Sequence, residues 1–159
     1  MNEFGAMSSD ELRDLYRELI LDHARKPRHF GKLESATHSA EGINPLCGDK
    51  LRLYLQVDAA GNIRDAAFEG SGCAISVASA SLLTDSIIGL HERDALAKFE
   101  DVTSSLTASA GDVQRSIKLG KLRALEGVRQ FPARVKCATL AWHALRSAIN
   151  QQTSPARTE

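Results

Sequence analysis

Apolar residues recur at helical spacing near the start of the chain. The stripe consists of Leu12, Leu15, Tyr16, Leu19, Ile20 and His23. Positions three and four apart share one face of a helix, so this pattern predicts a helix with one buried face. Ser8 and Glu11 have capping-box spacing at its start, and Pro27 predicts its end. We expect His23 to be a hydrogen-bonded structural histidine rather than a metal ligand.

An alternating pattern follows in the next part of the chain. Leucines and a valine alternate with more polar residues from Leu51 to Val57, which is the period of a strand with one buried face. Residues 58–62 have the composition of a turn, and residues 63–69 form the predicted return strand of a hairpin. Residues 37–43 are predicted as a third strand.

Small residues dominate after the hairpin. They occur on every face between Cys73 and Leu83, which predicts a buried helix that ends near Gly89. Pro132 is predicted to open a last helix with an apolar stripe through Trp142. Shorter helices are predicted at residues 94–99, 102–108, 111–116 and 122–128.

This order of elements predicts an α+β fold, in which a small antiparallel sheet of three strands has helices packed on one face. The chain has 159 residues and 43% of them are hydrophobic, which is enough for one core. Residues 8–150 are therefore expected to form a single domain. Residues 1–7 and 151–159 are expected to be loose termini.

Charge and cysteine content narrow the class of protein. The 20 basic residues balance the 20 acidic ones, so neither nucleic acid nor a membrane surface is the expected partner. Without an apolar run of membrane length or the features of a signal peptide at the start, we expect a cytoplasmic protein. Three cysteines, an odd and low number, argue against a disulfide framework and favour metal binding or thiol chemistry.

Each cysteine lies at the boundary of a predicted element. Cys47 is in the irregular turn before the hairpin, Cys73 follows the hairpin, and Cys137 is near the start of the last helix. If the hairpin turn is centred on Ala60, residues 47 and 73 lie opposite each other on strands about 5 Å apart. Asp49 is two positions from Cys47 and can supply an oxygen ligand.

Three thiolates and one carboxylate make a four-coordinate site. Such thiolate-rich sites select zinc or iron–sulfur clusters over hard cations. Helix starts favour the thiolate forms of Cys73 and Cys137, and Arg134 and Lys136 add positive charge beside Cys137. Closed structural zinc sites normally use Cys and His, so the carboxylate of Asp49 indicates a site that can open.

The sequence around these residues resembles the IscU/NifU N-terminal family of iron–sulfur cluster assembly proteins, and within it the SufU branch. Lys136 stands where IscU scaffolds carry histidine, as in SufU proteins, and the 63 residues between Cys73 and Cys137 leave room for the SufU insertion. The matching segments are N-P-L-C-G-D at 44–49, F-E-G-S-G-C-A-I-S-V-A-S-A-S at 68–81, F-P-A-R-V-K-C-A-T-L at 131–140, and the opening run from Leu15 to Arg28.

The resemblance implies a zinc-dependent sulfurtransferase with an IscU/SufU-like fold. Zinc would be bound by Cys47, Asp49, Cys73 and Cys137. Cys47 would accept persulfide sulfur from a SufS-type, PLP-dependent cysteine desulfurase and pass it to a SufBCD scaffold. Whether such an acceptor and carrier counts as an enzyme is left open by the sequence.

Three other functions fit part of the pattern. The same ligands can hold a [2Fe–2S] cluster, which would make the protein a scaffold, although Lys136 in place of histidine disfavours this. A purely structural zinc module is disfavoured by Asp49. A cysteine hydrolase would use Cys47 as nucleophile with His23 or His38 as base, but the sequence has no oxyanion-hole signature.

A run of basic residues between positions 113 and 136 contains a single acid, Glu126. A solvated helical face is the ordinary interpretation of such a run. The alternative is a docking surface for an acidic patch of a partner, in which Arg123 and Arg129 are the expected contacts.

Overall fold

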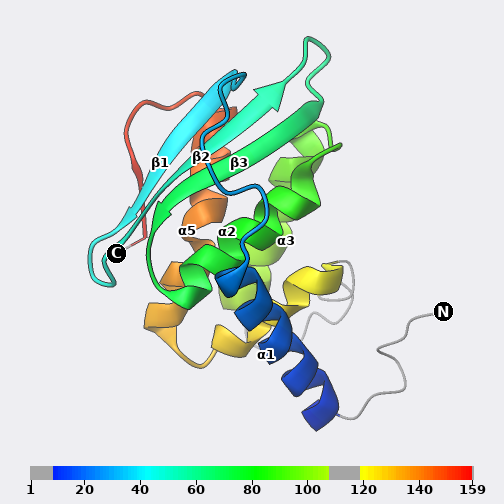
Figure 1. The fold of residues 1–159 in the computed structure, drawn as a ribbon, viewed down its shortest axis with the longest axis vertical. Coiled ribbons are helices and arrows are strands. Elements are labelled where there is room, and N and C mark those ends of the chain that lie inside the picture. Colours follow the sequence, from blue (N-terminus) through cyan, green and yellow to red (C-terminus); the bar gives the residue numbers. More distant parts are fainter. Residues whose placement is uncertain (1–8, 108–118, 159) are drawn as a thin grey trace, which may run out of the picture.

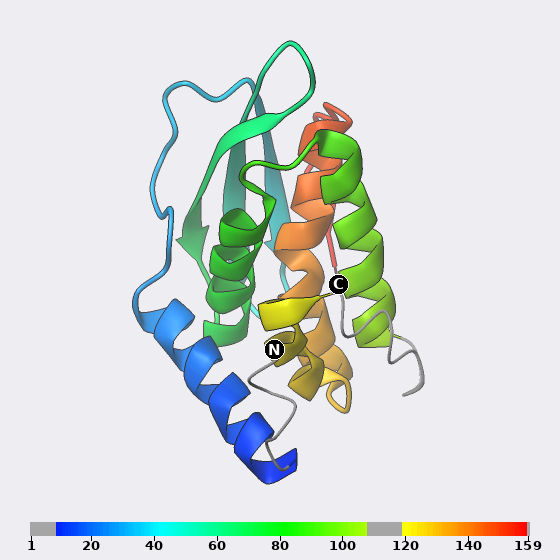
Figure 2. The same ribbon diagram turned by 90° about the vertical axis from the view of Figure 1, so that its right-hand side faces the viewer.

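A mixed sheet of four strands carries helices on one of its faces (Figures 1 and 2). The computed structural model describes residues 9–107 and 119–158. The strands are β1 (His38–Asn44), β2 (Asp49–Val57), β3 (Ile63–Ser71) and β4 (Ala156–Arg157). The helices are α1 (Ser9–Arg25), α2 (Ala74–Ile87), α3 (Glu92–Thr107), the 3₁₀ helix η1 (Gly120–Val128) and α5 (Pro132–Ile149).

The sheet confirms the predicted hairpin and the third strand. Strand β2 pairs antiparallel with both β1 and β3. Leu53 and Leu55, from the apolar phase of the alternating pattern, are fully buried against the helices. A bulge at Gln56 and Val57 moves the register of the hairpin by one position, so that Lys50 lies opposite Ser71. The register centred on Ala60 is therefore off by one residue.

The C-terminal tail differs from the expectation that it is loose. Ala156 and Arg157 form β4, which pairs parallel with β1 and makes the sheet mixed rather than purely antiparallel. Thr158 is also held, because its backbone nitrogen donates to the carbonyl oxygen of Ile43 and its hydroxyl donates to that of Lys136. The polar composition of the tail predicts that it frays, but β4 hydrogen-bonds to the backbone groups at the open edge of β1.

Helices α2 and α5 lie against the sheet, and α1 packs beside α2 at one end of the molecule (Figure 2). The small residues of α2 let the helices approach closely, as predicted, and Ser79 accepts a hydrogen bond from the indole nitrogen of the fully buried Trp142. His23 is structural, as expected: its Nδ1 lies 2.7 Å from the hydroxyl of Ser81 in the buried contact between α1 and α2.

The region after Gly89 differs from the sequence prediction. Two predicted short helices are one continuous helix, α3, and the predicted helix at 122–128 is the 3₁₀ helix η1. The predicted helix at 111–116 and the capping residue Ser8 lie outside the described residues. Among the described helices, none combines the length and the hydropathy that crossing a membrane requires.

Candidate metal centre

The turn between β1 and β2 presents the first two candidate ligands. It is closed by a hydrogen bond from the Cys47 backbone nitrogen to the Asn44 carbonyl oxygen, and Gly48 takes a positive φ of 72°. Cys47 is exposed at this turn. Asp49 begins β2, and its side chain is buried beneath the turn.

The other two cysteines come from helix starts. Cys73 is the N-cap residue of α2 and is half-buried. Its backbone nitrogen donates to Oδ1 of Asp49 over 2.8 Å, which ties the start of α2 to the start of β2. Cys137 is fully buried in the second turn of α5. Both helix starts therefore lie at the open end of the hairpin, where the sequence analysis expects Cys47 and Cys73.

The candidate ligands converge in space. The sulfur atoms of Cys47 and Cys137 and a carboxylate oxygen of Asp49 all lie within 4.8 Å of one another. The thiol of Cys73 interacts with that of Cys137. In a tetrahedral zinc–thiolate site, with metal–sulfur bonds of about 2.3 Å, neighbouring sulfurs are about 3.8 Å apart. The spacing of Cys47, Asp49 and Cys137 fits zinc, while Cys73 lies outside this close group and contacts Cys137. The chemistry of all four side chains fits zinc or a thiolate-bound cluster.

The electrostatics of Cys137 differ from the sequence expectation. Burial raises the pKa of the Cys137 thiol well above its ordinary value, and its hydrogen bonds with Asp49, Cys47 and Cys73 raise it further. Burial thus opposes the thiolate form that the helix start and the neighbouring basic residues were expected to favour. A bound cation would reverse the balance, because metal ligation deprotonates a thiol.

Asn44 is a site residue to which the sequence analysis gives no role. It is fully buried, and its Nδ2 lies 3.5 Å from Oδ2 of Asp49 and 3.7 Å from the sulfur of Cys137. Within the described residues, its buried Oδ1 has no hydrogen-bond partner. The buried amide of Asn44 thus donates hydrogen bonds to two candidate ligands, Asp49 and Cys137. The N-P-x-C motif was the available signal, but its first residue has no metal-binding chemistry of its own.

Gly72 was also missed, and it sets the space around Asp49. A Cβ atom at this position would lie 2.5 Å from Oδ1 and 3.2 Å from Cγ of Asp49. Only glycine lets the chain that leads to Cys73 pass this close to the carboxylate. The contact joins residues 23 positions apart, so the glycine-rich composition of the link could indicate a turn but not this contact.

The four basic residues singled out from the sequence have different surroundings. The Arg129 guanidinium donates to the carbonyl and hydroxyl oxygens of Ser105 and lies 3.5 Å from Glu126, so it fastens η1 to α3. Arg123 and the exposed Arg134 line a groove beside α1. Lys136 is half-buried and directly precedes Cys137.

The geometry contradicts a cysteine hydrolase that uses either proposed base. His23 is in the core with Ser81. His38 is at the opposite end of β1 from Asn44, about 20 Å away for six residues of strand, and its ring contacts Thr37 and Gln151. His38 is therefore out of reach of Cys47, and the ring of His23 is already engaged with Ser81.

Comparison with known proteins gives consistent matches over most of the chain. The family model described as the NifU-like N terminal domain matches residues 15–138. The zinc-dependent sulfurtransferase SufU of Bacillus subtilis is 42% identical over 142 residues, which cover 89% of this chain and 93% of the relative. The iron–sulfur cluster assembly scaffold protein IscU of Streptococcus pyogenes is 37% identical over 148 residues, 93% of this chain and 91% of the relative.

Solved structures agree with the fold. A protein of Fervidobacterium islandicum, described as an iron–sulfur cluster assembly scaffold protein for the SUF system, superposes with a TM-score of 0.75. It is 31% identical in sequence, and the match covers 93% of this chain and 99% of that one.

Proposed function

Because the chain belongs to the NifU-like N-terminal family of iron–sulfur cluster assembly proteins, we propose that it is a zinc-dependent sulfurtransferase within that machinery. In this proposal, Cys47 accepts sulfur from a cysteine desulfurase of the SufS type. The protein then delivers the sulfur to a SufBCD scaffold.

The observation that carries the proposal is the unequal exposure of the candidate ligands. Cys47 is exposed on a turn, whereas Cys137 and Asp49 are buried behind it. Leu46, which is 76% exposed, and Gly48 flank Cys47, so of the three cysteines Cys47 is the one most open to an incoming protein, whereas Cys73 is half-buried. A site with one exposed ligand, one half-buried ligand and two buried ligands suits transfer to the exposed sulfur first.

Zinc held by Cys47, Asp49, Cys73 and Cys137 would keep the thiols deprotonated at neutral pH. Hydrogen bonds from neighbouring residues of the chain hold these ligands in position. Asn44 donates hydrogen bonds that orient Asp49 and Cys137, and the Cys73 backbone nitrogen orients the second oxygen of Asp49. Lys136 places a cationic side chain, which cannot act as a ligand while protonated, directly before Cys137.

The transfer step is a thiol–persulfide exchange. The Cys47 thiolate attacks the outer sulfur of the persulfide that the desulfurase carries. A sulfur–sulfur bond forms on Cys47, the sulfur–sulfur bond of the donor breaks, and the donor cysteine leaves as a thiolate. Neither an oxidant nor a reductant is consumed, so the two proteins suffice for the exchange.

A scaffold function is the second candidate, and the ligand set favours it too. Three thiolates and a carboxylate can bind a [2Fe–2S] cluster, and relatives at 37% and 40% identity are named IscU scaffolds. We place sulfur transfer first because Lys136 occupies the position before the third cysteine and because the SufU relative is 42% identical.

The turnover of a purified SufS-type desulfurase tests the proposal. We expect the zinc-loaded protein to stimulate cysteine desulfuration strongly and the Cys47→Ser variant to lose the stimulation while it keeps its fold. Asn62→Ala, in the distant turn of the hairpin, is the matched control and should stimulate normally. Equal stimulation by Cys47→Ser would overturn the assignment of Cys47 as acceptor.

A further inference from the structure

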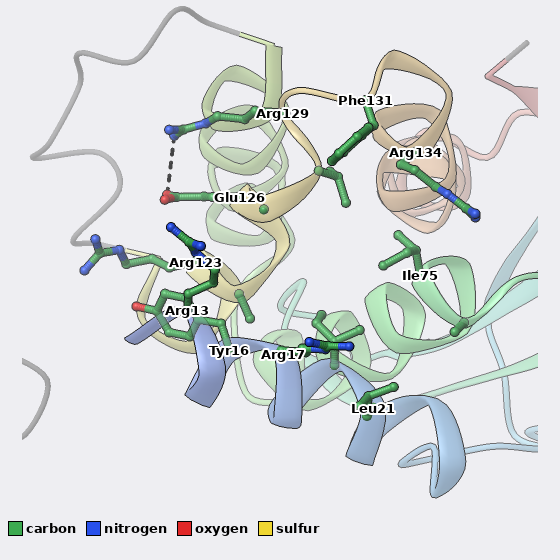
Figure 3. A pocket seen from close by; sticks show the side chains of 15 residues that line it. Arg13, Tyr16, Arg17, Leu21, Ile75, Arg123, Glu126, Arg129, Phe131 and Arg134 are labelled. Carbon is green, nitrogen blue, oxygen red and sulfur yellow. Dashed lines mark ion pairs between the residues drawn. The ribbon is translucent and has the colours of Figure 1, made fainter. Parts of the chain in front are cut away.

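A groove lies between α1, the start of α2, η1 and the start of α5 (Figure 3). Its volume is about 930 Å³. Apolar side chains, among them Ile20, Leu21, Ile75 and Val128, make its floor. The groove is lined at one end by Ala74 and Ile75, which directly follow Cys73. It is also lined by Phe131, the N-cap residue of α5, the helix that carries Cys137. A protein seated in this groove would therefore lie beside the candidate metal centre.

Positive charge surrounds the apolar floor. Five arginines line the groove: Arg13, Arg17, Arg123, Arg129 and Arg134. The one acidic lining residue, Glu126, is paired with Arg129. The whole chain has a formal net charge of zero, so this groove concentrates positive charge that the rest of the molecule offsets.

The arginines differ in how firmly they are engaged. Arg129 is fixed to Ser105 and Glu126, which disfavours the sequence-based expectation that it is a docking contact. Arg13 and Arg17 are exposed on α1 beside the groove (Figure 3), and Arg13 makes a surface ion pair with Asp10, over 3.7 Å. Nε of Arg123 is buried and, within the described residues, lacks a hydrogen-bond acceptor, so this atom is not itself open to an incoming group. The groove thus offers guanidinium groups that an incoming carboxylate can engage.

The spacing on α1 indicates the form of the occupant. Arg13, Arg17 and Leu21 are each four residues apart, so they follow one face of the helix at one-turn intervals. A second helix laid along this face would present side chains at the same interval. Its apolar residues would enter the floor, and acidic residues on its flank would face the arginines.

We propose that this arginine-lined groove binds an acidic amphipathic helix of the cysteine desulfurase that supplies the sulfur. The inference rests on the proposed function for the identity of the partner. Charge complementarity argues against a symmetric contact between two copies through this groove, since that would bring two sets of arginines together. Docking here sets the partner beside the helix starts that carry Cys73 and Cys137.

The test is the affinity of the purified desulfurase for Arg13→Glu/Arg17→Glu, both on the exposed wall of α1. At low salt we expect binding more than tenfold weaker than in the wild type, and a difference that shrinks as salt is raised. Arg13→Gln/Arg17→Gln removes the charges without reversing them and should weaken binding by a smaller factor. Arg93→Glu, exposed at the start of α3, is the matched control and should bind normally.

The readouts separate this inference from the proposed function. The arginine variants should keep their zinc content and reach wild-type maximal stimulation at saturating concentration, because the metal centre is unchanged. If the wild type stimulates the desulfurase and the variants bind it equally well, the groove inference is overturned while the function stands. If the wild type neither binds nor stimulates the desulfurase, both fail. Loss of binding to anionic vesicles, with desulfurase binding unchanged, would assign the groove to lipid instead.

Discussion

Asn44 connects the backbone of β1 with the chemistry of the candidate metal centre. It is the last residue of β1, and its buried amide lies between Asp49 and Cys137. Residues that orient ligands in this way typically contribute about 10–100-fold to metal affinity. We therefore expect Asn44→Ala to weaken zinc binding by about this factor.

Competition titration with a chromophoric zinc chelator measures the effect on zinc binding. Asn62→Ala removes an asparagine far from the site and should leave the affinity unchanged. Wild-type zinc affinity in Asn44→Ala would contradict the orienting role of Asn44.

His23 makes the stability of the fold depend on pH. Burial lowers the pKa of His23, and the charge of Arg28 lowers it further, whereas Asp85 and Asp22 partly oppose the shift. The unfolded chain therefore binds the proton more readily than the folded one. The contribution of neutral His23 is complete above about pH 6.5 and is lost as the pH falls toward its lowered folded pKa.

Urea unfolding at about pH 7.5 and about pH 5.5 tests this dependence. The wild type should lose more of its free energy of unfolding on acidification than His23→Gln, in which the group that titrates is gone. An equal loss in the two proteins would show that other groups govern the acid response.

At the scale of elements, the link between β3 and α2 controls the position of Asp49. Gly72→Ala places a methyl group within 2.5 Å of Oδ1 of Asp49, so the carboxylate must move. We expect zinc affinity to fall by about tenfold or more, as for a displaced ligand. Cobalt titration, followed by the thiolate-to-metal absorption, measures this change. Gly127→Ala, where the added Cβ meets open space, is the control. An unaltered titration of Gly72→Ala would contradict the close contact.

The C-terminal strand β4 is the second element with a measurable role. Removing residues 151–159 deletes its pairing with β1 and the two hydrogen bonds of Thr158. A few net hydrogen bonds of about 1 kcal/mol each predict a loss of about 1–3 kcal/mol in the free energy of unfolding. Urea denaturation measures it. Thr158→Val removes the hydroxyl alone and should cost less, and an unchanged midpoint in the truncated protein would contradict a structured tail.

Local patterns predicted most elements because their signals are short-range. The alternation in β2, the small residues of α2 and the proline at the start of α5 each act within one element. The hairpin register was off by one because the bulge at Val57 depends on packing. Pairing of β4 with β1 joins residues more than a hundred positions apart, which composition cannot reveal.

The candidate site was predictable for a related reason. Its candidate ligands lie at element boundaries that the topology brings to one end of the sheet. The contributions of Asn44 and Gly72 depend on interatomic distances, so they emerge only from the structure. The high pKa of Cys137 likewise reflects burial that a helix position alone does not predict.

At the scale of the whole molecule, the candidate metal centre and the arginine-lined groove lie next to each other. The exposed sulfur of Cys47 can meet a partner atom, and the groove can bind the partner's acidic helix. In this account, the groove provides the affinity for the partner, and Cys47 carries out the sulfur transfer. Variants in the groove should change the concentration needed for half-maximal stimulation, whereas Cys47→Ser should abolish stimulation at every concentration.

The central claim is that Cys47 itself receives the sulfur. The most direct measurement is mass spectrometry of the zinc-loaded protein after incubation with the desulfurase and cysteine, with thiols and persulfides trapped by alkylation. The account predicts one additional sulfur on the peptide that contains Cys47 and none on that peptide in Cys47→Ser. No sulfur on Cys47, together with a stable [2Fe–2S] cluster on the same four residues when iron is supplied, would contradict it and identify the protein as a scaffold.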